Sequence, residues 1–253
     1  LSLRKASQIQ KKFLKLQLAT KADMILTLDR VIKDPNGMSI KEKKRRVQFS
    51  LKCAKTALQL KAELLDLGEK FDSLLFAVVH PYGPRLDKIN DKLIRKYEQN
   101  CDDYLSQLMD YEDEIGIYFD GFAIGSLIPL PISLVKSIGN FISKRIHEER
   151  KQVILHGLGM TSTKMLELLE CGFDSFDTNF HIKLAKNKYY LSNHGKPVKI
   201  DKVKTLKCDC PICSSYSLRE LRERRKGVKE VSTVLISLHN FFVYKKQFNN
   251  YTF

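Results

Sequence analysis

Three cysteines and one histidine in the last quarter of the chain have the side chains and the spacing of a metal site. Cys208, Cys210 and Cys213 form a Cys-x-Cys-x-x-Cys segment, and His239 follows in an apolar run at residues 234–240. Three thiolates and one imidazole complete a tetrahedral zinc set, which leaves no coordination position for water or substrate. The pattern therefore predicts a structural Zn²⁺ ion. The alternative is three buried free cysteines and a core histidine.

Polar and small side chains follow the apolar runs that predict buried strands. The carboxyl ends of parallel strands meet at one edge of the sheet, where the active sites of α/β barrels lie. The residues in these positions are Asp29, His80, Gly125, Ser126, His156, Gly157 and Asp177. Carboxylates can accept hydrogen bonds from the N–H groups of a small polar heterocycle, and glycines let the backbone approach it.

A second carboxylate in such a pocket could attack a sugar C1 and form a covalent glycosyl-enzyme, as in retaining glycosidases. The alternative for Asp29 or Asp177, taken alone, is a helix cap or a solvent-facing turn, because aspartate is common in the loop that opens a helix. The residues by themselves leave both interpretations open.

Strands and helices must alternate to bring these side chains together. Apolar runs predict strands at residues 22–29, 73–80, 115–125, 152–159 and 175–177. Helical periodicity is found at residues 2–19, 39–67, 86–108, 132–151 and 162–170. This alternation is typical of successive parallel βα units, so we expect an α/β protein with a (β/α) barrel.

The alternation ends after Asp177. Residues 188–200 predict a hairpin that turns at residues 193–195, residues 217–226 a basic helix, and residues 231–244 an apolar helix that carries His239. We therefore expect three parts. They are a partial barrel with the active-site face at residues 1–187, a zinc-binding subdomain at 188–230, and the last barrel helix at 231–253.

The chain is strongly basic, with 44 Lys and Arg residues against 29 Asp and Glu residues and a net charge of +15. Such an excess is expected of a protein that binds a polyanion, and nucleic acid is the leading partner. The candidate phosphate-contacting residues are Lys183, Lys186, Arg219, Arg222, Arg224, Arg225, Lys226 and Lys229. The alternative is a solvated basic surface, partly neutralised by neighbouring glutamates.

Cysteine usage and hydropathy bear on the compartment. Six cysteines, three of them clustered with metal spacing, indicate a reducing compartment, and we expect a cytoplasmic location. The longest apolar stretch, residues 121–135, contains Pro129 and Pro131 and is too short to span a bilayer, so no membrane association is expected. The sequence begins with Leu1 rather than methionine, and we expect an N-terminal part to be missing.

Several segments together resemble the tRNA-guanine transglycosylases, which have an irregular (β/α)8 barrel with a zinc subdomain near the last helix. The family's zinc pattern places 25 residues between the third cysteine and the histidine, as between Cys213 and His239. Residues 172–177 resemble the nucleophile segment, which implies that Asp177 attacks ribose C1′. Residues 119–127, with Gly125, Ser126 and Leu127, resemble the segment whose backbone contacts the base.

Other positions refine this resemblance. Asp29 matches the aspartate that reads the guanine edge, and residues 184–186 followed by Tyr190 are closer to archaeal members. His80 stands where members usually have Gln, and Ser126 where they have a second glycine; both changes bear on base identity. The first barrel strands, with the Asp-Ser-Gly-Gly-Phe-Gln motif of the proposed general acid/base, have no counterpart, nor do the RNA-binding domains of archaeal members.

The resemblance implies an enzyme that exchanges guanine in tRNA for a 7-deazaguanine base through a covalent Asp177–ribose intermediate. A related branch that inserts 7-deazaguanine into DNA is one alternative. A non-catalytic, nucleic-acid-binding subunit of a two-chain transglycosylase is another, and a binding module without chemistry is a third. A homodimer or a partner chain that completes the barrel is also left open.

Overall fold

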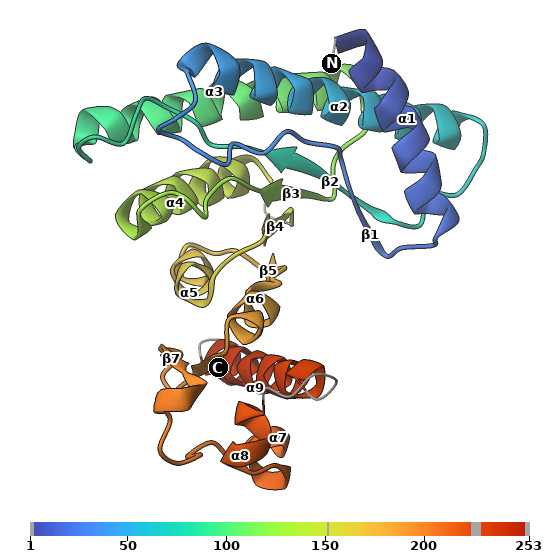
Figure 1. Cartoon of the computed structure of the whole chain (residues 1–253). Coiled ribbons are helices and arrows are strands. Elements are labelled where there is room, and N and C mark those ends of the chain that lie inside the picture. Colours follow the sequence, from blue (N-terminus) through green and yellow to red (C-terminus); the bar gives the residue numbers. More distant parts are fainter. Residues whose placement is uncertain (1–2, 151, 224–228, 251–253) are drawn as a thin grey trace. The chain divides into compact units, whose positions relative to one another are not determined.

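The computed structural model describes residues 3–150, 152–223 and 229–250. The chain divides into two compact units. The half-barrel unit consists of Leu1–Leu158 and Glu167–Asp177, and the cluster unit of Gly159–Leu166 and Thr178–Phe253. In Figure 1 the half-barrel unit runs from blue to yellow, and the orange and red ribbons belong to the cluster unit.

The half-barrel unit is organised around one sheet of five parallel strands. The strands are β1 (Met24–Leu26), β2 (Leu74–Val79), β3 (Gly121–Ile124), β4 (Ile154–Gly157) and β5 (Ser175–Phe176), and they lie in chain order. Leu26 is in register with Phe76, Val79 with Ile124, and Gly157 with both Ile124 and Phe176. The expected α/β class with parallel βα units is confirmed, and the carboxyl ends of the strands share one edge.

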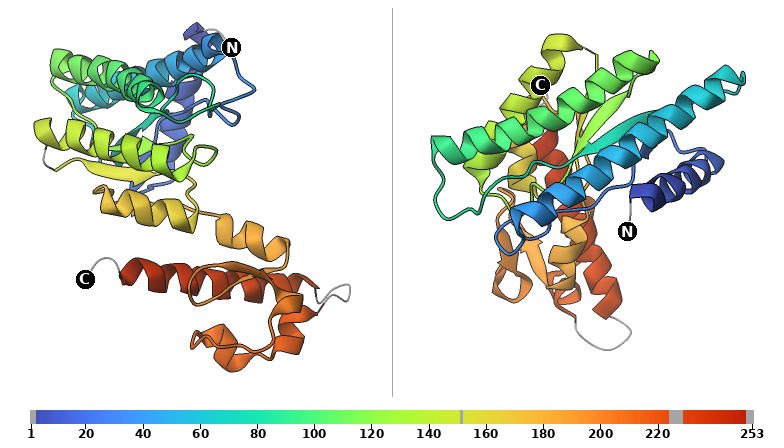
Figure 2. Two further views of the ribbon diagram at one scale, coloured as in Figure 1. Left: turned by 90° about the vertical axis from the view of Figure 1, so that its left-hand side faces the viewer. Right: turned by 90° about the horizontal axis from the view of Figure 1, so that it is seen from above.

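The first four helices pack one against the next in chain order. They are α1 (Leu3–Ala19), α2 (Ile40–Asp66), α3 (Asp91–Ile115) and α4 (Ile132–Glu149), followed by the shorter α5 (Ser162–Glu170). α1 packs against α2, α2 against α3, and α3 against α4, and the view from above in Figure 2 shows α1, α2 and α3 side by side. α2 and α3 also contact β2, whose residues from Leu75 to Val79 are buried.

The third helix and the third strand differ from the expected bounds. The helix expected at residues 86–108 begins only at Asp91, because the Asn90 side chain accepts a hydrogen bond from the backbone N–H of Leu93 and caps it. It continues to Ile115 and ends at Gly116, whose φ of 67° is left-handed. The strand expected at residues 115–125 is therefore limited to Gly121–Ile124.

Close packing joins β2 and β3. A Cβ atom on Gly121 would lie 2.2 Å from Cε1 of Phe76, so only glycine fits between the Phe76 ring and the next strand. Phe76, Val78 and Ala123 form a buried apolar cluster, against which Leu26 and Ile154 pack. This cluster links four strands and fixes the sheet that carries the strand-end residues.

The cluster unit is built around one long helix. Its elements are α6 (Phe180–Lys186), β6 (Tyr189–Leu191), β7 (Pro197–Lys199), the 3₁₀ turn η1 (Ile200–Lys202), α7 (Pro211–Ser215), α8 (Leu218–Arg222) and α9 (Lys229–Asn249). α9 contacts α6, β6, α7 and α8. β6 and β7 pair antiparallel, as the hairpin pattern predicts.

Two helices of the cluster unit were not expected, and one is shorter. α6 and α7 have seven and five residues, too few for a periodic pattern to stand out. The basic helix expected at residues 217–226 is α8, which ends at Arg222, with Glu223 as its C-cap. Among the described residues, the structure has no helix that is both long enough and apolar enough to cross a membrane.

Candidate functional site

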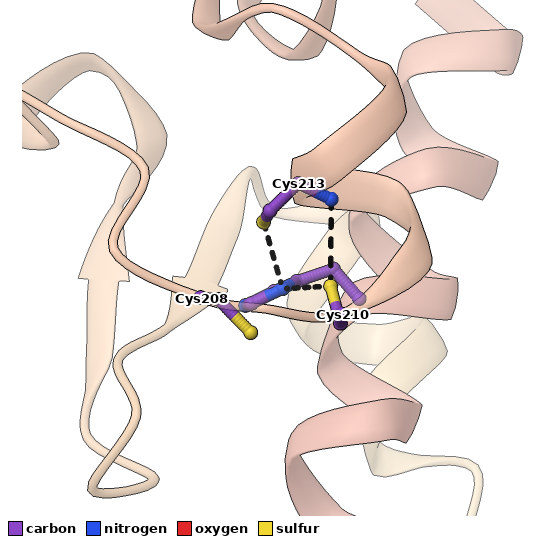
Figure 3. Close-up of side chains that lie close together, drawn as sticks. Cys208, Cys210 and Cys213 are labelled. Atoms are coloured by element: carbon purple, nitrogen blue, oxygen red, sulfur yellow. Dashed lines mark hydrogen bonds between the residues drawn. The ribbon is translucent and has the colours of Figure 1, made fainter.

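The four predicted metal ligands converge in the cluster unit. One side-chain ligand atom from each of Cys208, Cys210, Cys213 and His239 lies within 4.8 Å of all the others. Nδ1 of His239 is 3.3 Å from the sulfur of Cys210 and 3.3 Å from that of Cys213. Figure 3 shows the three cysteine sulfurs around one point. Tetrahedral zinc with bonds of about 2.0–2.3 Å places neighbouring ligand atoms roughly 3.5 Å apart, so the donor set fits this ion.

Backbone groups orient the histidine for metal binding. Nε2 of His239 lies 2.8 Å from the carbonyl oxygen of Leu191, which can only accept, so Nε2 carries the hydrogen and Nδ1 presents its lone pair. The side chain is fully buried, and burial lowers the pKa of His239, which favours the neutral ring that a metal requires. Its ring stacks on Tyr190 with the centroids 3.7 Å apart.

The thiols are held by local structure and by the small core around them. Cys210 is the N-cap of α7, and its sulfur accepts a hydrogen bond from the backbone N–H of Cys213. Burial raises the pKa of the Cys213 thiol to about 12, so a cation must displace its proton to bind there. Asp209, which lies between Cys208 and Cys210 in the sequence, forms a 3.0 Å ion pair with Lys246 of α9. The four side chains thus form a cluster that is compatible with a structural zinc site.

In the half-barrel unit, the first strand-end pair is Asp29 with His80. Nε2 of His80 is 2.8 Å from Oδ2 of Asp29, and Nδ1 of His80 is 2.9 Å from the hydroxyl of Ser126. That hydroxyl also accepts a hydrogen bond from the backbone N–H of Ile32 at 2.8 Å. The His80 side chain is fully buried, whereas 29% of the Asp29 side chain is exposed. The structure therefore brings together three of the predicted residues.

A second pair lies at the other side of the same sheet. Nε2 of His156 is 3.3 Å from Oδ1 of Asp177, and its Nδ1 is 2.9 Å from the hydroxyl of Ser175. His156 and Ser175 are register partners on β4 and β5. The Asp177 side chain is 58% exposed, and that of His156 only 5%. In both pairs, therefore, the histidine is buried and the carboxylate that it contacts is partly exposed to solvent.

The remaining residues predicted to contact the base lie at the ends of β3 and β4. Gly125 follows β3, and a Cβ atom there would lie 2.8 Å from Cε1 of His80, so glycine leaves room for the ring. Gly157 is the last residue of β4, and Leu127 is buried in the loop after β3. Ser126, which lies between Gly125 and Leu127 in this loop, has a φ of 60°.

Residues that the sequence interpretation missed complete both sites. Ser175 begins β5 and lies two positions before Asp177, a spacing that places both side chains on the same side of an extended backbone and could have identified Ser175. Leu191 and Ile32 contribute backbone atoms, so no side-chain pattern marks them. Tyr190 places its hydroxyl 3.2 Å from the sulfur of Cys213.

The predicted phosphate contacts differ in their surroundings. Lys183 and Lys186 are exposed in the last turn of α6, and Arg219 is exposed on α8. The guanidinium of Arg222 instead donates to the carbonyl oxygens of Ile200, Asp201 and Val203. Arg224, Arg225 and Lys226 lie outside the described residues, and only the backbone of Lys229 is described.

Comparison with known proteins places this geometry in context. The family model TGT, described as queuine tRNA-ribosyltransferase, matches residues 5–251. The chain is similar to the tRNA-guanine(15) transglycosylase of Pyrococcus furiosus, with 31% identity over 134 residues, which cover 52% of this chain and 22% of the relative. The corresponding protein of Thermococcus onnurineus is 32% identical over 136 residues, with the same coverage.

A bacterial protein shows the same likeness. The queuine tRNA-ribosyltransferase of Lachnoclostridium phytofermentans is 28% identical over 143 residues, which cover 50% of this chain and 35% of that protein. The match thus spans about a fifth to a third of the length of these relatives. Since the family model matches nearly the whole chain, the chain belongs to the queuine tRNA-ribosyltransferase (TGT) family.

Proposed function

We propose that the chain carries the nucleophile and the base-reading carboxylate of a transglycosylase that exchanges guanine in tRNA for a 7-deazaguanine base. The observation that carries the proposal is the placement of Asp29 and Asp177 at the carboxyl edge of one parallel sheet, each on a buried histidine. The family match supports the reaction class. The names of the relatives support tRNA as the substrate, and no observation favours DNA.

Asp177 is the proposed nucleophile. Its carboxylate is more than half exposed and is contacted by His156 through one oxygen. Attack on ribose C1′ forms a C1′–oxygen bond as the bond to guanine N9 breaks, and the incoming base then attacks C1′ and releases the carboxylate. Two displacements at one carbon retain its configuration, as in retaining glycosidases.

Asp29 is the proposed reader of the base. An ionised carboxylate only accepts hydrogen bonds, so it selects a heterocycle edge that presents N–H groups, as guanine and 7-deazaguanines do. Gly125, Leu127, Gly157 and the backbone of Ser126 remain proposed base contacts at the neighbouring strand ends. A site whose buried acceptor is left unpaired by the wrong base rejects that base strongly.

The proposal assigns this chain only part of the chemistry. The motif to which the resemblance assigns proton transfer has no counterpart among the 253 residues. The leaving guanine and the incoming base nevertheless exchange protons with some acid or base. The metal centre has a structural role in the proposal, and Lys183, Lys186 and Arg219 are proposed to contact phosphates.

Trapping the covalent intermediate tests the proposal. The protein is incubated with unmodified tRNA, quenched with denaturant and examined for a complex that survives denaturation. The wild-type chain should form such an adduct, and Asp177→Asn should not, because an amide is a poor nucleophile. Asp110→Asn, an exposed carboxylate on α3, is the matched control and should behave as wild type.

The same measurement separates the catalytic proposal from the alternative of a non-catalytic subunit. A chain that binds tRNA and never forms an adduct would support that alternative. An adduct of equal yield in Asp177→Asn would contradict the nucleophile assignment.

A further inference from the structure

Both strand-end histidines have each ring nitrogen within hydrogen-bond distance of another protein side chain. His80 contacts Asp29 and Ser126, and His156 contacts Asp177 and Ser175. We propose that His80 and His156 are positioning residues that hold the two functional carboxylates, and that neither contacts the base. This inference rests on the proposed function, because it names how that site is held in place.

The hydrogen bonds around His80 have one direction. The ionised carboxylate of Asp29 can only accept, so Nε2 of His80 carries the hydrogen of the neutral ring and Nδ1 is left as an acceptor; the Ser126 hydroxyl then donates to Nδ1 while its oxygen accepts from the backbone N–H of Ile32. Nε2 donates its hydrogen to Oδ2 of Asp29. Oδ1 of Asp29 accepts no hydrogen bond from the described residues, and this oxygen is the acceptor left for the base.

Packing leaves the His80 ring no second position. Its side chain is fully buried, and the missing Cβ atom of Gly125 is the space that Cε1 occupies. Ser126 provides its hydroxyl from a left-handed backbone conformation with a φ of 60°, which L-residues other than Asn and Asp rarely adopt. A strained serine in contact with a buried histidine indicates that the hydroxyl has a role there.

His156 repeats this arrangement with a longer contact to its carboxylate. Ser175 faces it across the β4–β5 register, and its hydroxyl can donate to Nδ1, which leaves the hydrogen on Nε2 for Asp177. The contact with Asp177 is 3.3 Å, against 2.8 Å for Asp29, and Asp177 is twice as exposed. The carboxylate that reads the base must stay fixed, whereas the nucleophile must approach C1′. The shorter contact of Asp29 and the longer contact of Asp177 fit these two roles.

Histidine NMR tests the hydrogen-bond scheme independently of any activity. With ¹⁵N-labelled histidine, we expect His80 and His156 in the Nε2–H form without any base present. The N–H signal of His80 should exchange slowly with water and should change in Asp29→Ala and in Ser126→Ala. An Nδ1–H form would overturn the proposal, and so would a His80 signal that is unchanged from wild type in both variants.

Guanine binding tests the consequence for the site. By calorimetry, we expect Ser126→Ala and His80→Gln each to weaken guanine binding about 10-fold, and the double variant to be no weaker than His80→Gln alone. Additive losses would mean that both residues contact the base independently and would overturn the proposal. Ser126→Ala removes a single oxygen, so it serves as the test even where His80→Gln fails to fold.

The second histidine should affect a different quantity. His156→Gln should slow formation of the tRNA adduct about 10-fold while guanine affinity stays within twofold of wild type. Loss of guanine affinity in this variant would assign His156 to base contact instead. His147 of α4 is the matched control, because its ring lies between Ser143 and the carbonyl of Val153, before the amino end of β4 and not at the carboxyl ends of the strands. His147→Gln should change neither quantity.

The two proposals can fail separately. If the wild-type chain binds no guanine and forms no adduct, the proposed function fails. The NMR measurement still decides whether the histidines hold the carboxylates.

Discussion

His239 of the cluster unit and His80 of the half-barrel unit are both buried and both held at one ring nitrogen, yet they present opposite chemistry at the other. A carbonyl oxygen holds Nε2 of His239, which leaves a lone pair on Nδ1 for a metal. A hydroxyl that itself accepts from a backbone N–H holds Nδ1 of His80, which leaves a hydrogen on Nε2 for a carboxylate. The group behind the ring thus determines whether the histidine serves as a ligand or as a donor.

The two sites also differ in their exposure to solvent. The four predicted metal ligands converge on each other, and His239 has no exposed surface. Asp29 and Asp177 are supported from the buried side and are exposed on the other. A closed donor set stabilises a fold, whereas a carboxylate with one accessible side can meet a substrate. We therefore expect the two units to respond to different perturbations.

Metal removal should have the largest effect. Structural zinc contributes about 10–16 kcal/mol of apparent folding free energy in small domains, so a chelator or Cys213→Ser should unfold the cluster unit. Amide hydrogen exchange should rise at Tyr189–Leu191 and Pro211–Ser215 and stay low at Leu74–Val79. Unchanged exchange at the cluster after chelation would mean that its apolar core is sufficient and that the two units are held alike.

A steric change in the sheet should have an intermediate effect, on the other unit. Gly121→Ala forces a methyl group into the Phe76 ring and should lower the unfolding free energy of the half-barrel unit by about 1–3 kcal/mol. The measurement is chemical denaturation followed by hydrogen exchange of β2. Gly68→Ala is the control, because nothing lies within 4 Å of that position and only its φ of 73° opposes a side chain. An unchanged unfolding free energy in Gly121→Ala would exclude the steric explanation.

The smallest effects should separate two arginines of α8. Arg219 is exposed, so Arg219→Ala should reduce the slope of log affinity for tRNA against log salt by about 1 and leave stability unchanged. Arg222 holds three backbone carbonyls, so Arg222→Ala should destabilise the cluster unit by about 1.5–3 kcal/mol with little effect on the slope. The reverse pattern would move the phosphate contact from Arg219 to Arg222.

Spacing predicted the convergence of the four donor side chains and the order of the half-barrel strands well, because ligand type and apolar runs are local features. The cysteine spacing and His239 define a donor set without reference to the rest of the fold, and the four ligands converge. The strand ends were harder to bound. Asn90 and Gly116 determine where α3 lies, and such caps compete with the apolar pattern that suggested a strand from Ile115.

What the sequence could not provide is the pairing between side chains. His80 was expected at the base pocket, but its contacts with Asp29 and Ser126 depend on the register of three strands and on a loop. Arg222 was grouped with its basic neighbours, although its carbonyl partners lie about 20 residues upstream in the chain. Residue type shows what a side chain can do, and only the fold shows whether another group already uses it.

The backbone of Ser126 carries a thermodynamic trade-off. A residue with a side chain in the left-handed region gives up roughly 1–2 kcal/mol that a glycine would keep. Ser126→Gly should therefore relieve backbone strain, while it removes the hydroxyl that contacts His80. Thermostabilising substitutions in this protein are therefore best sought away from the loop after β3.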